Sequence, residues 1–171
     1  NDDAENFRLV EAPVATPGRE HWRDVIPHRE DTRLVDVDAF ARHLVVAFRR
    51  DGLTGLRIVD TIGAGGDDPQ AGGEAGMDSS HEIEFPEPVY TVGPGDNPEY
   101  DTSTVRLSYT SLVTPSSVFD YDIASRTLTL RKRQPVLGGY DTERYESARE
   151  WATADDGTLI PISLVWIVAV A

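Results

Sequence analysis

The sequence contains no cysteine, which excludes disulfides and thiolate metal sites and is compatible with a reducing compartment. A basic leader followed by an apolar run is missing from the first residues, so they do not resemble a signal peptide. The one long apolar run, LIPISLVWIVAVA at 159–171, contains a proline and falls short of the roughly 20 residues that span a bilayer. We therefore expect a cytoplasmic protein without a membrane partner, and a buried strand at 159–171.

Basic residues are scarce, because 16 Lys and Arg stand against 30 Asp and Glu, for a formal net charge of −14. Nucleic-acid binding requires a clustered basic surface, so this balance argues against a nucleic-acid partner. Negative charge lining a cleft would favour cationic ligands, whereas many acidic domains use the same charge only to stay hydrated.

Long stretches of helical periodicity are also rare, whereas short apolar or alternating runs between turn residues are frequent, which predicts an all-β fold. A first pair of runs predicts a hairpin at 5–13 and 16–27. An antiparallel meander follows at 32–40, 43–50 and 53–60, with a tight turn at Asp51-Gly52. Later strands are predicted at 81–87, 88–95, 104–113, 117–125 and 127–136. The two meanders, 32–87 and 88–138, are similar in plan, as blades of a β-propeller would be.

Between the meanders, residues 61–80 read TIGAGGDDPQAGGEAGMDSS and predict a flexible loop or linker. The GAGG within it is no GxGxxG, is followed by no Lys-Ser/Thr pair and precedes no predicted helix. A phosphate-binding loop is therefore disfavoured.

Three stretches carry a family resemblance: ENFRLVEAPVATPGREHWRDVIPHRED, then SYTSLVTPSSVFDYDIASRTLTLRKRQPVLGGYD, then WATADDGTLIPISLV. They resemble, in this order, the prolyl oligopeptidase family of serine peptidases, and within it the oligopeptidase B (protease II) subgroup. The resemblance implies a seven-bladed β-propeller over an α/β-hydrolase domain with a Ser-Asp-His triad. It also implies hydrolysis of short peptides, after Arg or Lys in oligopeptidase B and after proline in prolyl oligopeptidase.

By this resemblance the chain is a fragment that covers the junction of the two domains. The implied parts are the end of one blade at 1–31, the last two blades at about 32–87 and 88–138, a hinge at 139–145, and the first strands of the peptidase domain at 146–171. The implied partners are the rest of the propeller, the catalytic domain and, in the intact parent, peptide substrates.

Catalytic residues are not expected on this chain, because a serine nucleophile in this fold requires a Gly-x-Ser-x-Gly elbow and the sequence has none. The serines fit strands, turns or loops better, at Ser79, Ser80, Ser111, Ser116 and Ser163. The histidines are scattered over separate segments, at His21, His28, His43 and His81. The metalloprotease motif HExxH is also absent, so we expect no metal-binding or cofactor-binding residue and no cofactor.

Acidic side chains alternate in two predicted strands. In TRLVDVDAF, Leu34, Asp36 and Asp38 would share one face, and Val35 and Val37 the other. The two aspartates would form either a solvated outer face or part of an acidic propeller interior that attracts cationic peptides. In HEIE at 81–84, the histidine and isoleucine would share one face and the two glutamates the other, which separates potential metal ligands.

A candidate hinge or interface begins at Gly138 and Gly139, which interrupt the strand pattern and offer φ freedom. Further candidates follow in YDTERYESARE: Tyr140 and Tyr145 as interface rings, and Arg144 and Arg149 as partners for carboxylates of either domain. An ordinary surface connector is the alternative. The hairpin between Trp151 and Trp166 is expected to turn at Asp155-Asp156-Gly157.

The expected contribution of this part is access control, since a propeller that shields the active site admits only short, unfolded peptides. Alone, the fragment is expected to be inactive, and to self-associate because two blades leave apolar flanks uncovered. The alternative is a stand-alone β-meander module that binds a peptide or protein without catalysis.

Overall fold

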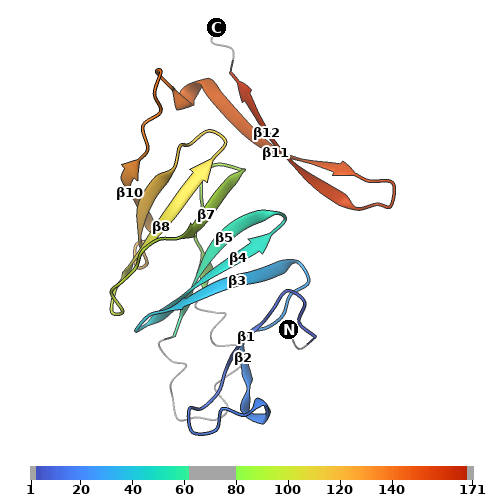
Figure 1. The fold of residues 1–171 in the computed structure, drawn as a ribbon, viewed down its shortest axis with the longest axis vertical. Coiled ribbons are helices and arrows are strands. Elements are labelled where there is room, and N and C mark those ends of the chain that lie inside the picture. The colour runs from blue at the N-terminus through green and yellow to red at the C-terminus, as the bar shows by residue number, and fades with distance from the viewer. Residues whose placement is uncertain (1–2, 62–79, 169–171) are drawn as a thin grey trace. The chain divides into compact units, whose positions relative to one another are not determined.

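The computed structural model describes residues 3–61 and 80–168, and within them all regular structure is β-strand apart from two short 3-10 helices (Figure 1). The strands run over Leu9–Glu11 (β1), Arg23–Ile26 (β2), Thr32–Ala39 (β3), His43–Arg50 (β4), Leu53–Asp60 (β5), His81–Glu82 (β6), Tyr90–Pro94 (β7), Thr104–Ser111 (β8), Ser117–Asp122 (β9), Thr127–Arg133 (β10), Tyr145–Thr153 (β11) and Leu159–Ile167 (β12). The 3-10 helices run over Arg19–His21 (η1) and Thr142–Arg144 (η2). No helix in these described ranges is long and apolar enough to cross a membrane.

The strands form four antiparallel sheets: β1-β2, β3-β4-β5-β6, β7-β8-β9-β10 and β11-β12. Both four-stranded sheets are meanders, as expected for propeller blades, and the all-β prediction is confirmed. The short β6 pairs with β5 and closes the first meander. Asp51 and Gly52, with φ of 53° and 78°, form the tight turn predicted between β4 and β5. The predicted loop at 61–80 and its GAGG lie almost wholly outside the described residues.

The chain is divided into two compact units. The first comprises Asn1–Arg50, Leu56–Ile83 and Glu99–Thr102, and the second comprises Asp51–Gly55, Glu84–Pro98 and Ser103–Ala171. The turn between β4 and β5 is therefore grouped with the second unit, which also holds β7 to β12.

The first unit has an aliphatic core in which the β1-β2 hairpin packs on the meander. Ile26 of β2 lies with Val46 of β4 and Val59 of β5 in one buried cluster. Asn6 fastens the chain before β1, because its side-chain amide donates to the carbonyl oxygens of Arg29 and Glu30 at 3.0 and 2.8 Å.

A β-bulge in β3 overturns the simple alternation expected there. The register with β4 skips Val35, which is 61% exposed, between Leu34 and Asp36. Leu34 and Val37 consequently both pack against the core cluster. The prediction that Leu34 shares a face with Asp36 and Asp38 was wrong, because one extra residue shifts every later side chain to the opposite face.

Two predicted strands are shorter than expected. The segment 5–13 becomes a strand only at β1, because Phe7 has φ of 65° and its N–H donates to the Ala4 carbonyl at 2.8 Å, which forms a turn. The segment 81–87 becomes the two-residue β6, and Pro86 further along has no N–H to offer a ladder.

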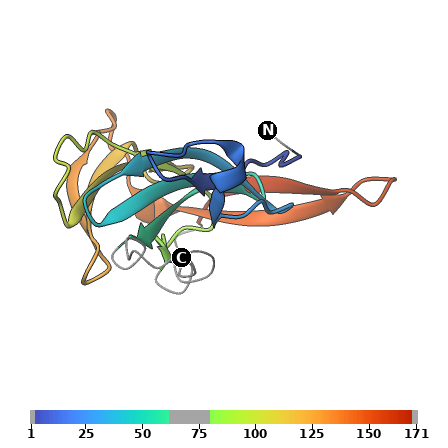
Figure 2. The same cartoon turned by 90° about the horizontal axis from the view of Figure 1, so that it is seen from below.

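In the second unit, buried Val92, Val105 and Leu107 form the centre of the β7-β10 sheet. Four aromatic rings pack together nearby, from Phe85, Tyr90, Tyr109 and Phe119, with neighbouring centroids 4.9 to 5.9 Å apart. The β11-β12 pair, in the same unit, forms one long twisted ribbon (Figure 2). It begins earlier than the predicted hairpin, because the charged YESARE segment also pairs in register.

Candidate functional site

The segment after β10 breaks from strand structure at Gly138 and Gly139. Their φ angles are 94° and 82°, in the left-handed region that glycine adopts without the steric cost of a Cβ. A Cβ at either position would meet no described atom within 4 Å beyond the chain neighbours. Glycine is therefore favoured here by backbone conformation and not by close packing. The role of the pair as a hinge stays a prediction.

Tyr140 anchors the chain directly after these glycines. Its hydroxyl donates to the carbonyl oxygen of Val113, in the turn between β8 and β9. Ser111 Oγ braces this turn by accepting from the amides of Val113 and Thr114 at 2.9 and 2.6 Å. The Tyr140 ring stacks on Tyr145, with centroids 5.2 Å apart, and desolvation raises the pKa of Tyr140. The two candidate rings thus contact each other, and one of them contacts the β7-β10 sheet.

The short η2 helix directly before β11 is capped by Asp141. Its carboxylate accepts from the Glu143 amide at 3.0 Å. The Arg144 carbonyl accepts from the Val168 amide at 2.8 Å, which extends the β11-β12 ladder by one pair. The side chain of Arg144, a candidate for pairing with a carboxylate, is exposed.

Arg149 of β11 makes the longest-range contact of this segment. One of its terminal nitrogens, Nη1, donates to Ser163 Oγ at 2.9 Å, and the other, Nη2, donates to the carbonyl oxygen of Asp51. The guanidinium also lies over the Trp151 ring, 5.5 Å from its centroid. Within the described residues it therefore binds neutral acceptors, whereas the sequence suggested carboxylates. Ser163 was foreseeable as its cross-strand partner from the predicted turn, but the Asp51 contact, 98 residues away, was not.

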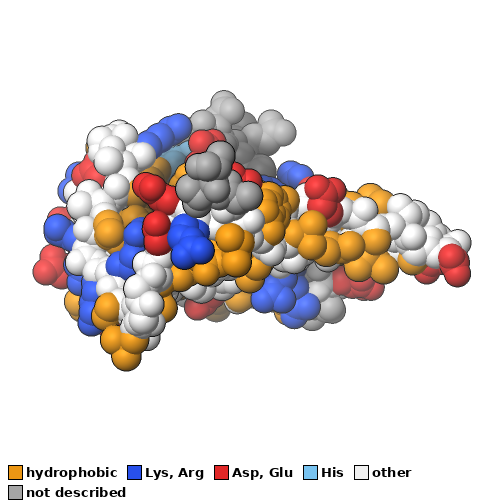
Figure 3. All heavy atoms as spheres, turned by 90° about the horizontal axis from the view of Figure 1, so that it is seen from above, with side chains coloured by type: hydrophobic (Ala, Val, Ile, Leu, Met, Phe, Trp, Pro, Cys, Tyr) orange, Lys and Arg blue, Asp and Glu red, His pale blue; other side chains and the backbone are white. Residues whose placement is uncertain are grey.

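The β12 strand is exposed at all nine positions, so the expectation of a buried strand at 159–171 was wrong for its described part. Leu159 and Ile167 at its ends are 60% and 62% exposed. Figure 3 shows hydrophobic side chains along much of this hairpin. The described residues leave both faces of this apolar strand largely uncovered, which marks the hairpin as a surface that other residues would cover.

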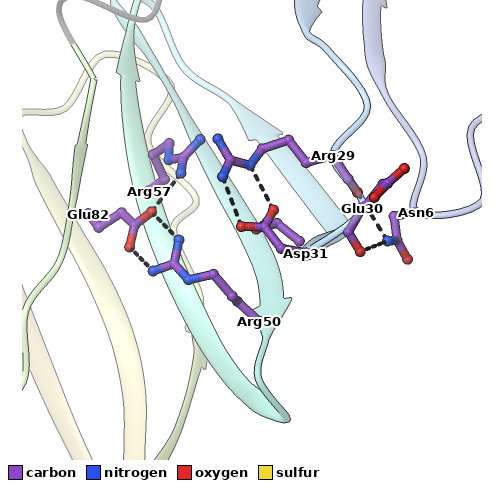
Figure 4. Close-up of polar contacts among 8 residues, drawn as sticks. Asn6, Arg29, Glu30, Asp31, Arg50, Arg57 and Glu82 are labelled. Carbon is purple, nitrogen blue, oxygen red and sulfur yellow. Dashed lines mark hydrogen bonds and ion pairs between the residues drawn. The ribbon is translucent and has the colours of Figure 1, made fainter. Parts of the chain in front are cut away.

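A separate set of charged side chains joins three strands of the first unit (Figure 4). Glu82 of β6 accepts from Arg50 of β4 at 3.0 and 2.7 Å and from Arg57 of β5 at 2.6 Å. The hydrogen bonds from Arg50 are the main cause that lowers the pKa of Glu82. Both guanidinium groups also lie within 5.5 Å of the Phe48 ring centroid. This network fastens the two-residue β6 to the sheet.

Arg29 and Asp31 form a second ion pair in the same close-up (Figure 4). Arg29 donates to both carboxylate oxygens of Asp31 at 2.9 Å, and this hydrogen bonding holds the pKa of Asp31 well below its usual range. The pair is exposed, so it orders the loop before β3 more than it stabilises the fold.

Asp120 of β9 is the corresponding centre in the second unit. Its carboxylate accepts from Arg106 of β8 at 2.8 and 3.0 Å and from Arg131 of β10 at 2.7 Å. Hydrogen bonds from Arg106, and then from Arg131, lower the pKa of Asp120 to about 2. Like the Glu82 network, this arrangement satisfies all its carboxylate oxygens within the sheet, and it presents no acid or base to a ligand.

The remaining chemistry-bearing side chains do not converge. His43 is buried and stacks on Phe40 at 4.8 Å, and burial lowers its pKa. Asp36 is exposed and accepts from the Val37 amide, whereas Asp38 is half-buried. Over residues 3–61 and 80–168, no three His, Asp or Glu side chains are placed to share a metal ion.

An open hollow of about 420 Å³ lies where the chain leaves β10. Its walls mix apolar groups such as Pro115 and Tyr140 with the charged Arg133 and Asp141. It lies against the junction segment, so the candidate site is this segment together with the hairpin that follows.

Comparison with known families gives a match that ends shortly before this segment. Residues 1–134 match the family model described as the N-terminal beta-propeller domain of prolyl oligopeptidase. The match ends one residue after β10, before the glycine pair and the β11-β12 hairpin.

Among individual proteins, the chain is 34% identical to dipeptidyl aminopeptidase BI of Pseudoxanthomonas mexicana over 166 residues. It is 28% identical to protease 2 of Moraxella lacunata. These alignments cover 96% and 98% of this chain but only 21% and 22% of the relatives, so the chain spans about a fifth of their length.

Solved structures give the same picture. Oligopeptidase B from Trypanosoma brucei, in a closed form with covalently bound antipain, superimposes with a TM-score of 0.79 at 33% identity. The similarity covers 99% of this chain and 23% of that one. Oligopeptidase B from Leishmania major gives a TM-score of 0.76 at 32% identity. The sequence resemblance is therefore confirmed, and the chain belongs to the prolyl oligopeptidase family of peptidases.

Proposed function

We propose that this chain forms the closing part of the propeller and the first hairpin of the catalytic domain in a serine oligopeptidase. In this proposal the two meanders are the last two blades, at 32–87 and 88–138, and 1–31 completes the blade before them. Residues 139–145 are the hinge and 146–171 begin the peptidase domain. The observation that carries the proposal is the end of the propeller match at residue 134, while the alignments to relatives continue over nearly the whole chain.

The exposed hairpin supports the same assignment. Packed domains bury sheet faces, so an apolar strand exposed at every position implies a covering layer. The rest of the catalytic domain is the layer that this proposal supplies. The contribution of residues 1–134 is then to restrict access to that domain, so that short, unfolded peptides enter.

Cleavage after Arg or Lys is the substrate preference we propose for the whole protein. It rests on the likeness to two structures of oligopeptidase B at 32–33% identity. The name of the relative from Pseudoxanthomonas mexicana, a dipeptidyl aminopeptidase, favours a second candidate, removal of dipeptides from an N-terminus. We further infer a cytoplasmic location, because the sequence contains no cysteine.

The product of the complete reading frame tests this proposal. We expect a Gly-x-Ser-x-Gly elbow followed by Asp and His downstream, and hydrolysis of chromogenic peptides ending in Arg or Lys, inhibited by a serine-directed reagent. Matched peptides ending in Pro, and dipeptidyl substrates with a free N-terminus, serve as controls. Absence of the elbow, or turnover by the purified 171-residue chain alone, would contradict the division of roles.

Self-association of the 171-residue chain is a second expected property. The exposed β12 strand leaves apolar surface that association between copies would cover. Light scattering at micromolar concentration should show a dimer or larger species, and replacing exposed Ile160, Ile162 and Leu164 by Thr should reduce it. A monomer in both proteins would refute this expectation.

A further inference from the structure

Arg149 is held within its own hairpin on two sides. Ser163 lies directly opposite it in the β11-β12 register and accepts from Nη1 at 2.9 Å. The Trp151 ring, two residues along the same strand face, lies 5.5 Å from the guanidinium carbon. Together these contacts orient the long side chain before it meets anything outside the hairpin, which lowers the entropy cost of its next contact.

That next contact is the backbone of the turn between β4 and β5. Nη2 donates to the Asp51 carbonyl, which a turn with φ of 53° at Asp51 and 78° at Gly52 presents. A Cβ on Gly52 would lie 3.0 Å from Arg149 Nη2 and 3.6 Å from Pro161 Cγ. Glycine is therefore required here twice, for its positive φ and for the close approach of the hairpin. This approach agrees with the grouping of Asp51–Gly55 in the same compact unit as β11 and β12.

The acceptors of Arg149 are neutral, and this sets the strength of the contact. Its Nε is buried without a hydrogen-bond partner among the described residues, and its two terminal nitrogens bind a hydroxyl and a carbonyl. A charge-assisted hydrogen bond to a neutral group orients the partners firmly. Breaking such a hydrogen bond costs less free energy than breaking a buried ion pair, because no opposite charge is left without a partner.

We propose that Arg149 is a positioning residue that latches the β11-β12 hairpin to the Asp51-Gly52 turn, and that this latch opens when the two domains separate about the 139–145 segment. The second half rests on the proposed gating function. Arg149 lies in β11, four residues beyond the end of that segment. Loss of the latch is expected to favour the open arrangement and to relax the selection for short peptides.

Hydrogen–deuterium exchange in the product of the complete reading frame tests the latch directly. Arg149→Gln removes the charge and one terminal donor nitrogen, and Arg149→Lys keeps the charge but has a single nitrogen for two acceptors. Both should speed amide exchange in residues 50–55 about tenfold. Arg144→Gln is the matched control, because Arg144 is an exposed arginine five residues away with the same charge change, and it should leave exchange unchanged.

Gly52→Ala approaches the same contact from the turn and should speed exchange in the same segment. A misfolded variant would be recognised by faster exchange throughout both sheets, and the two arginine variants then decide. Unchanged exchange at 50–55 in both Arg149 variants would overturn the latch, whatever the enzymatic activity.

Peptidase assays then distinguish the Arg149 contact itself from its proposed role in controlling substrate access. If the gate depends on the latch, Arg149→Gln should raise kcat/KM for a peptide of about 40 residues severalfold relative to a short chromogenic peptide. An unchanged ratio together with faster exchange would refute the gating role and leave a static support. Faster exchange in a protein without peptidase activity would support the latch and refute the proposed function.

Discussion

The two four-stranded sheets use the same device in different places. Each holds one carboxylate between two arginines from two other strands of the same sheet. In the first sheet the carboxylate is Glu82, on the outer strand β6, which has only two residues. In the second sheet it is Asp120, on the inner strand β9, which pairs along both of its edges. The first network replaces a ladder that is almost absent, and the second reinforces ladders that already exist.

Solvent exposure of the arginines adds to this contrast. Arg57 in the first network is only 13% exposed, whereas Arg106 and Arg131 in the second are 49% and 56% exposed. If a carboxylate loses its charge, half-exposed guanidinium groups can be hydrated instead, whereas Arg57 has less access to water; Arg50, at 36%, lies between them. Loss of the carboxylate charge should therefore destabilise the first sheet more than the second.

The β-bulges of the two sheets also differ, in the role of the extra residue. In β3 the extra residue is Val35, which points into solvent, whereas in β10 it is Arg131, which the bulge directs toward Asp120. The extra residue of the bulge is thus a solvent-facing valine in one sheet and an ion-pair partner in the other.

Acid should produce the largest change, because it removes both carboxylate charges. The folded protein lowers the pKa of Glu82 and Asp120, the latter to about 2, so their stabilisation is complete above their unfolded pKa values, near 4. It is lost as the pH falls through the folded pKa values. The contribution of these two carboxylates to stability, followed by thermal unfolding, should be constant above about pH 5 and decline between about pH 4 and 2. A level profile down to pH 2 would contradict the role of both networks.

Glu82→Gln should have the largest effect of the single substitutions, because one amide oxygen remains for two guanidinium groups and Arg57, only 13% exposed, has little access to water. We expect a local loss of about 2 kcal/mol, since hydrogen bonds to charged groups are worth about 1.5 to 3 kcal/mol. The Ile83 amide, which donates to the Leu56 carbonyl at 2.9 Å, should then exchange roughly 30-fold faster. Unchanged exchange at Ile83 would show that β6 is held by its ladder alone.

Asp120→Asn is the matched substitution in the second sheet, and its effect should be less than half as large. The amide oxygen still accepts from one arginine, and the other returns to solvent. Exchange of β9 and β10 amides measures the outcome. An effect equal to that of Glu82→Gln would remove the distinction between replacing and reinforcing a ladder.

Val35→Thr should have the smallest effect, within about 0.5 kcal/mol, because the side chain is largely exposed. Val37→Ala, which removes contacts with the core cluster, should cost about 1 kcal/mol and is the control. Thermal unfolding of the two variants compares them. A larger loss for Val35→Thr would indicate that the bulge depends on valine itself.

Much of the fold followed from alternation and turn chemistry. The predicted ranges 43–50 and 53–60 coincide with β4 and β5, since strong apolar patterns flank an Asp-Gly turn there. The β3 faces could not be predicted, because a bulge leaves no local signature in TRLVDVDAF. The short β6 could not be predicted either, since its pairing depends on Arg50 and Arg57, which lie far away in sequence.

The candidate site was located by its glycines, but its contacts were not. Gly138 and Gly139 mark a backbone requirement that is local and visible in a sequence. The contacts depend on how turns that are distant in sequence pack together: Tyr140 binds Val113, and Arg149 binds Asp51. Such packing cannot be derived from a single sequence. Hairpin register is the intermediate case, because the turn at 155–157 is sufficient to pair Arg149 with Ser163.

Pro161 limits where another strand can pair with the outer edge of β12. The Arg144–Val168 and Ala154–Thr158 pairs are hydrogen-bonded, and bonded pairs alternate along an antiparallel ladder. Pro161, opposite Trp151, therefore occupies a non-bonded pair, and its nitrogen faces the outer edge, where the backbone has no N–H to donate. A strand added along that edge finds uninterrupted donors only from Ser163 onward. The apolar strand β12 thus contains a proline that limits extension of the sheet along its outer edge.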